Sequence, residues 1–379
     1  MNKKRISLKI LLYLLIISST SCIEKFDFNG DKTKENLLVV DGFISNGTEP
    51  SVVYLSRTSE FVGLTIEGGY ALPERNAIVK IIDDDGNEEL LHEEIELKII
   101  HTKNEDNDSI SFPVSIIREG KYVSNAGFRG QIGKTYHLYV KTLNSDEYIS
   151  TPEKMLAPKG EIDSFYFNLG SQEKFDPETG KITYPYGLKF YTDLTLPVEN
   201  TYYILEWLAT YKVKMPFDTN DSVCYANQYP VNQINIINSK EENVTTLPAH
   251  HIAFFPLSNK FDIGFSIILK QYSVSKDAFE FKQLLKNQLD SKGTIFDPIP
   301  SKITGNVKKL NGEEEVLGHF GTRTLQERRI FILPKMIDGF EPRGYSVCGG
   351  GATPEGSLAF CFDCTKWRGG TRKKPDYWD

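Results

Sequence analysis

The feature that most limits how this chain can fold is a period of two in its apolar residues, repeated in short segments along most of its length. The segments are rich in β-branched and aromatic residues, which favour the pleated, half-buried surface of a sheet. They are VVYLS (52–56), AIVKII (77–82), TYHLYV (135–140), SFYFNL (164–169), GLKFYTDL (187–194), TYYILEWL (201–208), INII (234–237) and FDIGFSIILK (261–270). The pattern predicts a mainly β protein.

Residue pairs typical of tight turns separate these segments, because Gly, Asn and Asp tolerate the positive φ that short turns need. The pairs are Asn46-Gly47, Asp85-Gly86, Glu119-Gly120, Gly133-Lys134 and Asp338-Gly339. Phe, Tyr and Trp make up 12% of the chain, which also suits sheets.

The strand spacing predicts two bodies. Residues 37–157 hold strands of sandwich length at sandwich spacing, so we expect an immunoglobulin- or fibronectin-like sandwich. TPEKMLAPKG (151–160) has two prolines and no periodicity, and it is the natural boundary. Residues 158–379 then form a second, larger β-rich domain.

The second body contains one convincing helix, predicted over residues 276–291. Ser275 is a suitable N-cap and Asp277 lies in the first turn. An apolar face at helical spacing follows, which we interpret as core packing, and Gly293 is expected to end the helix. The face consists of Ala278, Phe281, Leu285 and Leu289, widened by Leu284.

Residues 1–21 have the form of an export signal. A basic start (3–9) precedes the apolar run ILLYLLII (10–17), which is shorter than the roughly 20 residues that a membrane span needs. Small residues follow and end directly at Cys22. This site is similar to a bacterial lipobox, although Ser19 stands where leucine is usual.

We expect Cys22 to become the first mature residue and to carry acyl chains, palmitate among them, which hold the protein on a membrane without a spanning helix. Residues 22–36 are polar and without periodicity, as suits a lipid-anchored tether. Ordinary secretion with an unrelated Cys22 is the alternative.

The charge of the mature chain argues against a nucleic-acid partner. Loss of residues 1–21 removes four of the 44 Lys and Arg and none of the 51 Asp and Glu, which leaves a net charge of −11. Nucleic-acid phosphates require a basic surface.

Four cysteines remain once Cys22 is assigned: Cys224, Cys348, Cys361 and Cys364. An even number in an exported chain indicates two disulfides, in one of three connectivities. We expect Cys361 and Cys364 to lie in different disulfides, because a bridge between them would close a very short, strained loop. One would join Cys224 and the other Cys348, so that the tail is stapled to the body.

Zinc binding and redox chemistry are the alternatives for CFDC (361–364). No histidine lies in this stretch and His319 is outside finger-like spacing, so no metal site is predicted. A thioredoxin-like motif needs a βαβ setting, whereas a Gly-rich loop (349–356) and a Gly-Gly pair flank this one.

Other polar clusters have simple interpretations. The three contiguous Asp of DDDGN (83–87) indicate a hairpin turn rather than a calcium loop, which spaces its ligands at alternate positions. The acidic residues of 105–108 indicate a second, solvated loop. His250 and His251 are expected on opposite faces of an extended segment, where they cannot bind one ion together.

The C-terminal tail is basic on an acidic protein. We favour a solvated terminus over a docking patch for a membrane headgroup or an acidic partner. Tyr377 and Trp378 are expected to pack back onto the body beside the disulfide. The basic residues are Lys366, Arg368, Arg372, Lys373 and Lys374.

The common catalytic motifs are absent from the sequence. There is no H-E-x-x-H, G-x-S-x-G, P-loop or G-x-G-x-x-G, so no catalytic residue and no cofactor is predicted. Carboxylate pairs for glycoside hydrolysis stay open, because they come from distant segments.

One ordered set of motifs covers nearly the whole mature chain. It consists of the lipobox, VVDGFISN (39–46), GKYVSNAGFRGQIGKTYHLYVKT (120–142), YISTPEKMLAP (148–158), the region of Asp193 and NTYY (200–203), GTIFDPIPSKITGNV (293–307), VLGHFGT (316–322) and CFDCTKWRGGTRKKPDYW (361–378). The set resembles domain-of-unknown-function family 4249, lipoproteins of Bacteroidota. The run from GNV to GHFG and the Cys-rich tail are its most specific parts.

The resemblance implies an outer-membrane lipoprotein with an unknown ligand that works with a TonB-dependent transport barrel, because such proteins are typically encoded beside these receptors. It implies no catalytic residue. Glu24 and Asp27 resemble the surface-export signal of such lipoproteins, which favours the cell surface over the periplasmic face. The alternative function is a lipid-anchored hydrolase acting on polysaccharide or peptide.

Overall fold

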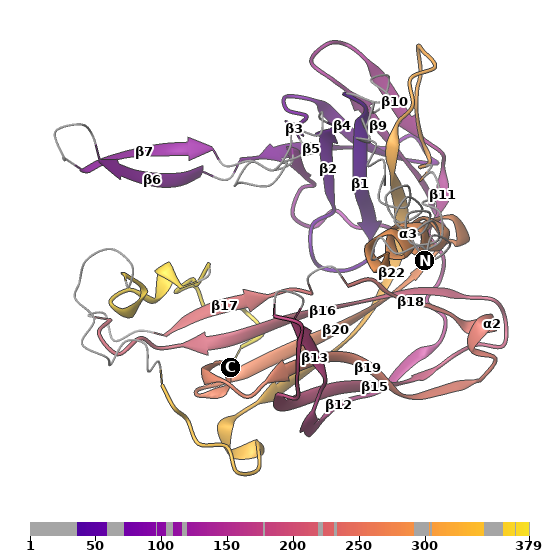
Figure 1. Cartoon of the computed structure of the whole chain (residues 1–379). Helices are drawn as coiled ribbons and strands as arrows, with labels where there is room; N and C mark the ends of the chain where they lie inside the picture. The colour runs from indigo at the N-terminus through magenta and orange to yellow at the C-terminus, as the bar shows by residue number, and fades with distance from the viewer. Residues whose placement is uncertain are drawn as a thin grey trace, which may run out of the picture. The chain divides into compact units, whose positions relative to one another are not determined.

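The computed structural model of the chain describes residues 36–58, 72–95, 97–103, 109–115, 120–176, 179–218, 223–230, 233–291, 303, 305–344, 359–367 and 369–378. Strands dominate these ranges, and their two α-helices are α2 (Ser239–Glu242) and α3 (Lys276–Asp290). The strands are arranged in sandwich-like layers (Figure 1). The predicted fold class, mainly β with at least one helix, is confirmed.

Most strands belong to one 15-stranded sheet. Three short strands branch from it: β11 (Glu153–Lys154) beside β9, β18 (Asn235–Asn238) beside β16, and β3 (Leu72–Pro73) beside β2. The main order is β17 (Cys224–Gln228), β16 (Tyr202–Val213), β20 (Phe265–Val274), β22 (Leu317–Ile332), β1 (Leu38–Ser45), β2 (Val52–Arg57), β8 (Gly120–Val123), β5 (Glu88–Glu94), β4 (Ile78–Asp83), β9 (Thr135–Lys141), β10 (Glu147–Ser150) and β21 (Val307–Lys309).

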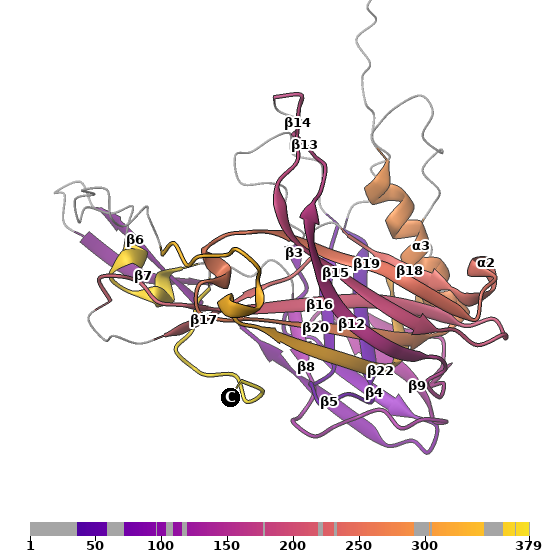
Figure 2. The same ribbon diagram turned by 90° about the horizontal axis from the view of Figure 1, so that it is seen from below.

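A second, three-stranded sheet has the order β12 (Glu161–Ser171), β15 (Tyr186–Thr195), β19 (Thr246–Pro256). It lies as a separate layer against β16 and β20 (Figure 1). Two hairpins complete the strands: β6 (Leu97–Lys103) with β7 (Ser109–Ser115), and β13 (Lys174–Asp176) with β14 (Lys181–Thr183). The β13–β14 hairpin projects from the three-stranded sheet (Figure 2).

The pairing of β1 with β22 joins the first described strand to the last, in parallel register from Val39–Leu317 to Ser45–Arg323. Glycine makes this approach possible. Gly318 has a φ of 93°, and a Cβ there would lie 1.8 Å from the carbonyl oxygen of Val40. A Cβ on Gly305 would lie 1.6 Å from the carbonyl oxygen of Gly318. The GNV-to-GHFG run of the sequence therefore holds the backbone contact that sets β22 beside β1.

Two large hydrophobic cores divide the chain near the expected boundary. One contains buried residues from Leu38 to Met155, and the other from Ile162 to Cys364. Val307, Val316 and Phe320, however, return to the first core. Residues Leu37–Asp379 thus form one compact unit, and two separable domains meeting near residue 158 stay a prediction.

Helix α3 begins as predicted. The Ser275 hydroxyl accepts a hydrogen bond from the Ala278 N–H at 3.1 Å, and Ala278 and Phe281 are buried. Phe279 is also buried and packs on the ring of Tyr202, a contact that helical periodicity alone did not predict. The prediction that Leu289 joins the buried face is wrong, because its side chain is 50% exposed.

Some predicted features lie outside the described residues. They are the signal (1–21) with Ser19, residues 22–35 of the tether with Cys22, the acidic loop (105–108), Gly293, Cys348 and Arg368.

No helix among the residues that are described is long and apolar enough to cross a membrane.

Candidate ligand-binding site

Two neighbouring cavities form the candidate site. The first, called here the cross-sheet cavity, has a volume of about 640 Å³. The second, called the edge cavity, has a volume of about 1000 Å³. Trp207 and Tyr229 line both of them, so the two cavities adjoin at these aromatic side chains. Volumes of this size are typical of pockets that bind small molecules or short segments of chain.

Strands β1, β2, β16, β20 and β22 line the cross-sheet cavity, and cations over aromatic rings mark its wall. The Arg323 guanidinium lies 3.9 Å from the ring centre of Tyr272 and 5.1 Å from that of Phe43. A carboxylate oxygen of Glu206 lies 3.5 Å from the guanidinium. The Nε of Arg323 is buried and has no hydrogen-bond partner among the described residues.

Further ion pairs line the cross-sheet cavity, so its charges are balanced. Lys270 contacts Glu49 at 2.6 Å, and Lys282 contacts Asp41 at 3.7 Å. A wall with both signs of charge and several aromatic rings favours a ligand that is amphipathic rather than strongly ionic.

The edge cavity lies between β19 on one side and the β17–β18 segment on the other. Amide side chains supply most of the polar groups of the second side: Gln228, Gln233 and Asn235. Charged residues come from the β12–β13 connection and from the end of α3, namely Glu173, Lys174, Lys286 and Asp290.

His250 and His251 both line the edge cavity but have different partners. His250 Nε2 lies 3.1 Å from Asn235 Oδ1, across the cavity. The His251 ring packs edge-on against Tyr191, with ring centres 5.5 Å apart. Partial burial lowers the pKa of both imidazoles; the neighbouring His251 lowers that of His250 further, and Lys189 does the same for His251. The two rings are therefore neutral at pH 7 and do not converge on one point.

A buried histidine–glutamate contact was missed from the sequence. His319 is 2% exposed, and its Nε2 lies 3.9 Å from Glu153 Oε2. Burial lowers the pKa of His319 to about 4 and raises that of Glu153. The contact is therefore not an ion pair at neutral pH. His319 stacks on Phe281 and lines neither cavity, so we assign it to the core.

The cysteine prediction is confirmed where the structure describes it. Cys224 and Cys364 form a disulfide across a sequence separation of 140 residues. Cys361 is also disulfide-bonded, and it is not bonded to Cys364. The assignment of Cys348 as its partner stays a prediction.

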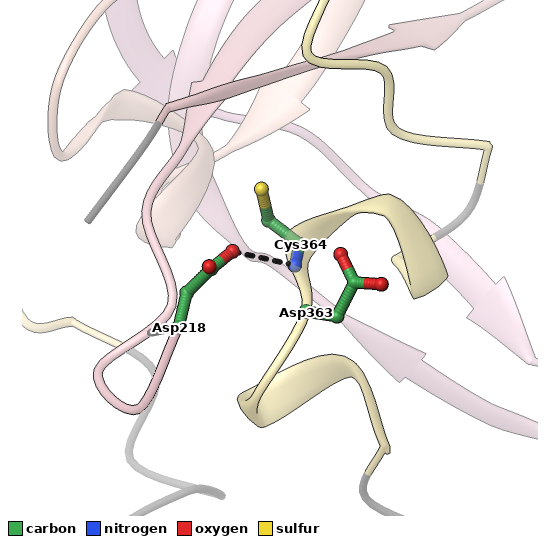
Figure 3. Close-up of side chains that lie close together, drawn as sticks. All are labelled: Asp218, Asp363 and Cys364. Carbon is green, nitrogen blue, oxygen red and sulfur yellow. Dashed lines mark hydrogen bonds between the residues drawn. The ribbon is translucent and has the colours of Figure 1, made fainter. Parts of the chain in front are cut away.

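The same tail holds a cluster of two carboxylates and a sulfur (Figure 3). The N–H of Cys364 donates to Asp218 Oδ2 at 3.1 Å. Arg372 then joins the two carboxylates, at 2.8 Å from Asp218 and 3.0 Å from Asp363. Because the Cys364 sulfur is bonded to Cys224 and Arg372 neutralises the acids, the cluster fixes the tail and is not suited to a metal.

The remaining tail predictions have mixed outcomes. Trp378 is 5% exposed and packs on Tyr225 and Phe331, which confirms that the tail folds back. The view of the basic tail as simply solvated is wrong for Arg372, which pairs with a carboxylate that is fully buried. Lys366, Lys373 and Lys374 are exposed as expected.

The acidic turn of residues 83–87 is the predicted hairpin between β4 and β5. Asp83 Oδ1 accepts hydrogen bonds from the N–H groups of Asp85 and Asn87, and Lys134 contacts the carboxylates of Asp83 and Asp85. The side-chain amide of Asn87 and then the Lys134 ammonium lower the pKa of Asp83 most, and the two backbone N–H groups lower it further. The lysine therefore occupies the position that a cation would take.

Comparison with known proteins gives one result. The family described as "Domain of unknown function (DUF4249)" matches residues 23–329, about four-fifths of the chain. No curated protein matches the sequence.

Proposed function

The chain belongs to the DUF4249 family, and on this basis we propose that it is a ligand-binding accessory lipoprotein without catalytic activity. In this proposal acylated Cys22 holds the protein on the outer membrane, at the cell surface. The protein works there with a TonB-dependent transport barrel. The lipobox and the order of motifs in the sequence support the anchor and the partner.

The observation that carries the ligand-binding part is the pair of cavities that share Trp207 and Tyr229. Aromatic side chains bury a large area at little conformational cost, and their polar ends keep a hydrogen-bonding function. Tyr229 is 59% exposed, so it is already accessible to a ligand. An accessory protein would hold its ligand there before passing it to the barrel.

Purification in a mild detergent tests the partner. The wild-type protein, isolated from native membranes, should co-purify with one large outer-membrane barrel, identified by mass spectrometry. Isolation without any barrel, at a salt concentration that preserves known barrel complexes, would contradict the accessory role.

Native mass spectrometry of the same preparation tests the site. Trp207→Ala and Tyr229→Ala should each lose a bound molecule that the wild type retains. Tyr186→Ala is the matched control, because Tyr186 is 51% exposed and lines neither cavity. Equal retention of the bound molecule by the wild type and the three variants would show that it binds elsewhere.

The hydrolase alternative makes a different prediction. Turnover of a polysaccharide or peptide would have to disappear when one carboxylate of the site, such as Asp41 or Glu206, becomes an amide. Binding without turnover supports the accessory role.

A further inference from the structure

The edge cavity touches consecutive residues of β19. Its lining includes every residue of His250–Phe254, followed by Pro256. Side chains of a strand alternate between two faces, so a cavity beside one face touches every second residue. A cavity that touches five in succession lies against the edge of the strand, where the main-chain N–H and C=O groups are.

The wall opposite β19 is also lined by consecutive residues, as the edge of a strand is. Residues 233–236, which lead into and include the start of β18, line the cavity without interruption. Among the described strands, β18 pairs with β16 alone and β19 pairs with β15 alone. Two open sheet edges therefore face one cavity. The contact of His250 with Asn235 is a bond from one edge to the other.

The β19 edge carries bulges but no charged side chain over the segment that lines the cavity. Proteins block an exposed edge with charged side chains, above all lysine, or with proline. The segment AHHIAFF (249–255) contains no Asp, Glu, Lys or Arg, and both of its imidazoles are neutral at pH 7. Pro248 and Pro256 stand only at its ends. The register of β19 is irregular at Ile252 and again at Pro248–Ala249, so the regular stretches that a further strand would pair with are short, His250–His251 and Ala253–Pro256.

We propose that an extended peptide segment of a partner protein binds in the edge cavity as an additional strand on β19. The proposal rests on the proposed ligand-binding function and names its ligand class. Main-chain hydrogen bonds to β19 would supply the affinity, as in other cases of strand addition. The added strand would displace the His250–Asn235 contact, and the amides of Gln233 and Asn235 would then bond the other side of the peptide.

The residues that line the cavity also indicate the length and the side-chain pattern of the peptide. A segment of about six residues spans roughly 20 Å in extended form, which matches the length of the AHHIAFF edge. Trp207, Tyr229 and Phe254 offer aromatic contacts, so apolar side chains should alternate along the segment. Glu173, Lys174, Lys286 and Asp290 present both signs of charge, which places any charged residue of the peptide at its ends.

The experiment uses full-length protein in detergent, immobilised and exposed to a phage-displayed library of random dodecapeptides. Enriched peptides should contain a short uncharged segment with alternating apolar residues. Each is then synthesised with N-methyl groups on alternate amides, in either of the two possible registers. Strand addition predicts that one register lowers the affinity at least tenfold more than the other.

A lysine at the edge provides the test from the protein side. His251→Lys should weaken the enriched peptide at least tenfold, because His251 is exposed and lies in the pairing segment. His92→Lys is the matched control, an exposed histidine of β5 that lines neither cavity, and it should bind as the wild type does. Equal effects of the two N-methyl registers, or full binding by His251→Lys, would overturn strand addition.

Failure of strand addition and failure of the ligand-binding function are distinguishable. If the library gives no enriched peptide while a glycan array gives ligands that Trp207→Ala abolishes, the cavity is a ligand site and strand addition is wrong. If neither probe binds and the purified protein carries no molecule, the ligand-binding function itself is wrong.

Discussion

The hydroxyl of Tyr377 lies 2.8 Å from Oγ1 of Thr210, a residue of β16 that stands 167 positions earlier in the chain. The Arg329 guanidinium of β22 lies 3.5 Å from the centre of the same tyrosine ring. Trp378 packs on Tyr225 of β17. The last residues of the tail thus lie across strands of the large sheet, and the disulfide and Arg372 hold the segment that leads to them.

Loss of the Cys224–Cys364 disulfide should destabilise the protein strongly. The bridge closes a loop of 140 residues, which corresponds to roughly 4–5 kcal/mol in the chain-entropy model. Cys224→Ser and Cys364→Ser should each lower the free energy of unfolding by about this amount in denaturant titrations. The Cys224→Ser/Cys364→Ser double variant should lose no more than either single one, since one bond accounts for both. Peptide mapping without reduction should recover the two cysteines in one linked peptide, and free thiols there would contradict the assignment.

Removal of Arg372 should take from the buried Asp218 carboxylate the guanidinium that lies 2.8 Å from it. Breaking a buried ion pair costs about 3–5 kcal/mol, and we expect about 2–3 kcal/mol here because the Arg372 side chain is 33% exposed. Arg372→Met tests this by chemical denaturation. Lys373→Met is the control, an exposed neighbour that should change stability by less than about 0.5 kcal/mol. Asp218→Asn added to Arg372→Met should restore part of the loss, and no restoration would assign the effect to packing alone.

His319 should make the protein acid-sensitive. Its pKa is about 4 in the folded chain and near 6.5 when unfolded, so below pH 6.5 the unfolded state takes up the proton first. Stability is therefore lost as the pH falls from about 6.5 to 4, by roughly 3 kcal/mol in total. The raised pKa of Glu153 acts in the opposite direction, because its folded form gains stability on protonation.

A comparison of variants isolates the histidine, since Glu153 is present in all of them. His319→Phe and His319→Leu should each show a shallower loss of unfolding free energy between pH 7 and pH 4.5 than the wild type. The measurement is a series of urea titrations at fixed pH. Parallel pH profiles for the wild type and both variants would show that His319 is not the titrating group.

Cys22→Ala should release the protein from the membrane fraction or stall its processing, as expected if Cys22 carries the acyl chains. Fractionation with metabolic labelling by a palmitate analogue checks both outcomes. Ser18→Ala is the control, because it alters the signal without removing the acceptor cysteine. Unchanged labelling and retention in Cys22→Ala would place the anchor elsewhere.

Local sequence patterns predicted much of the fold. Alternation of apolar residues predicted the strands, a serine cap predicted the start of α3, and cysteine parity predicted that the tail is bonded to the body. The parallel pairing of β1 with β22 was not predictable in this way, because it joins segments almost 280 residues apart and no local period encodes a partner at that distance.

The candidate site was harder to predict from the sequence for the same reason. Trp207 and His250 were read as parts of separate strands, and only the meeting of two sheets places both at one cavity. Leu289 fits the helical period of α3, but the buried residues of the helix all lie in its first two turns and Leu289 near its end is exposed. The His319–Glu153 contact depends on β11 lying beside β22, which neither segment indicates alone.

The place of β1 has a mechanical consequence. Tension that reaches the folded body along the chain from its N-terminal side enters at Leu37 and acts first on β1, which is flanked by β2 and β22. An edge strand peels away one hydrogen bond at a time, whereas a strand with partners on both sides must break two ladders together. If residues 22–36 act as the proposed tether, a pull on them is borne by the middle of the sheet, and residues near position 320, the last of the large sheet to be synthesised, help to carry it.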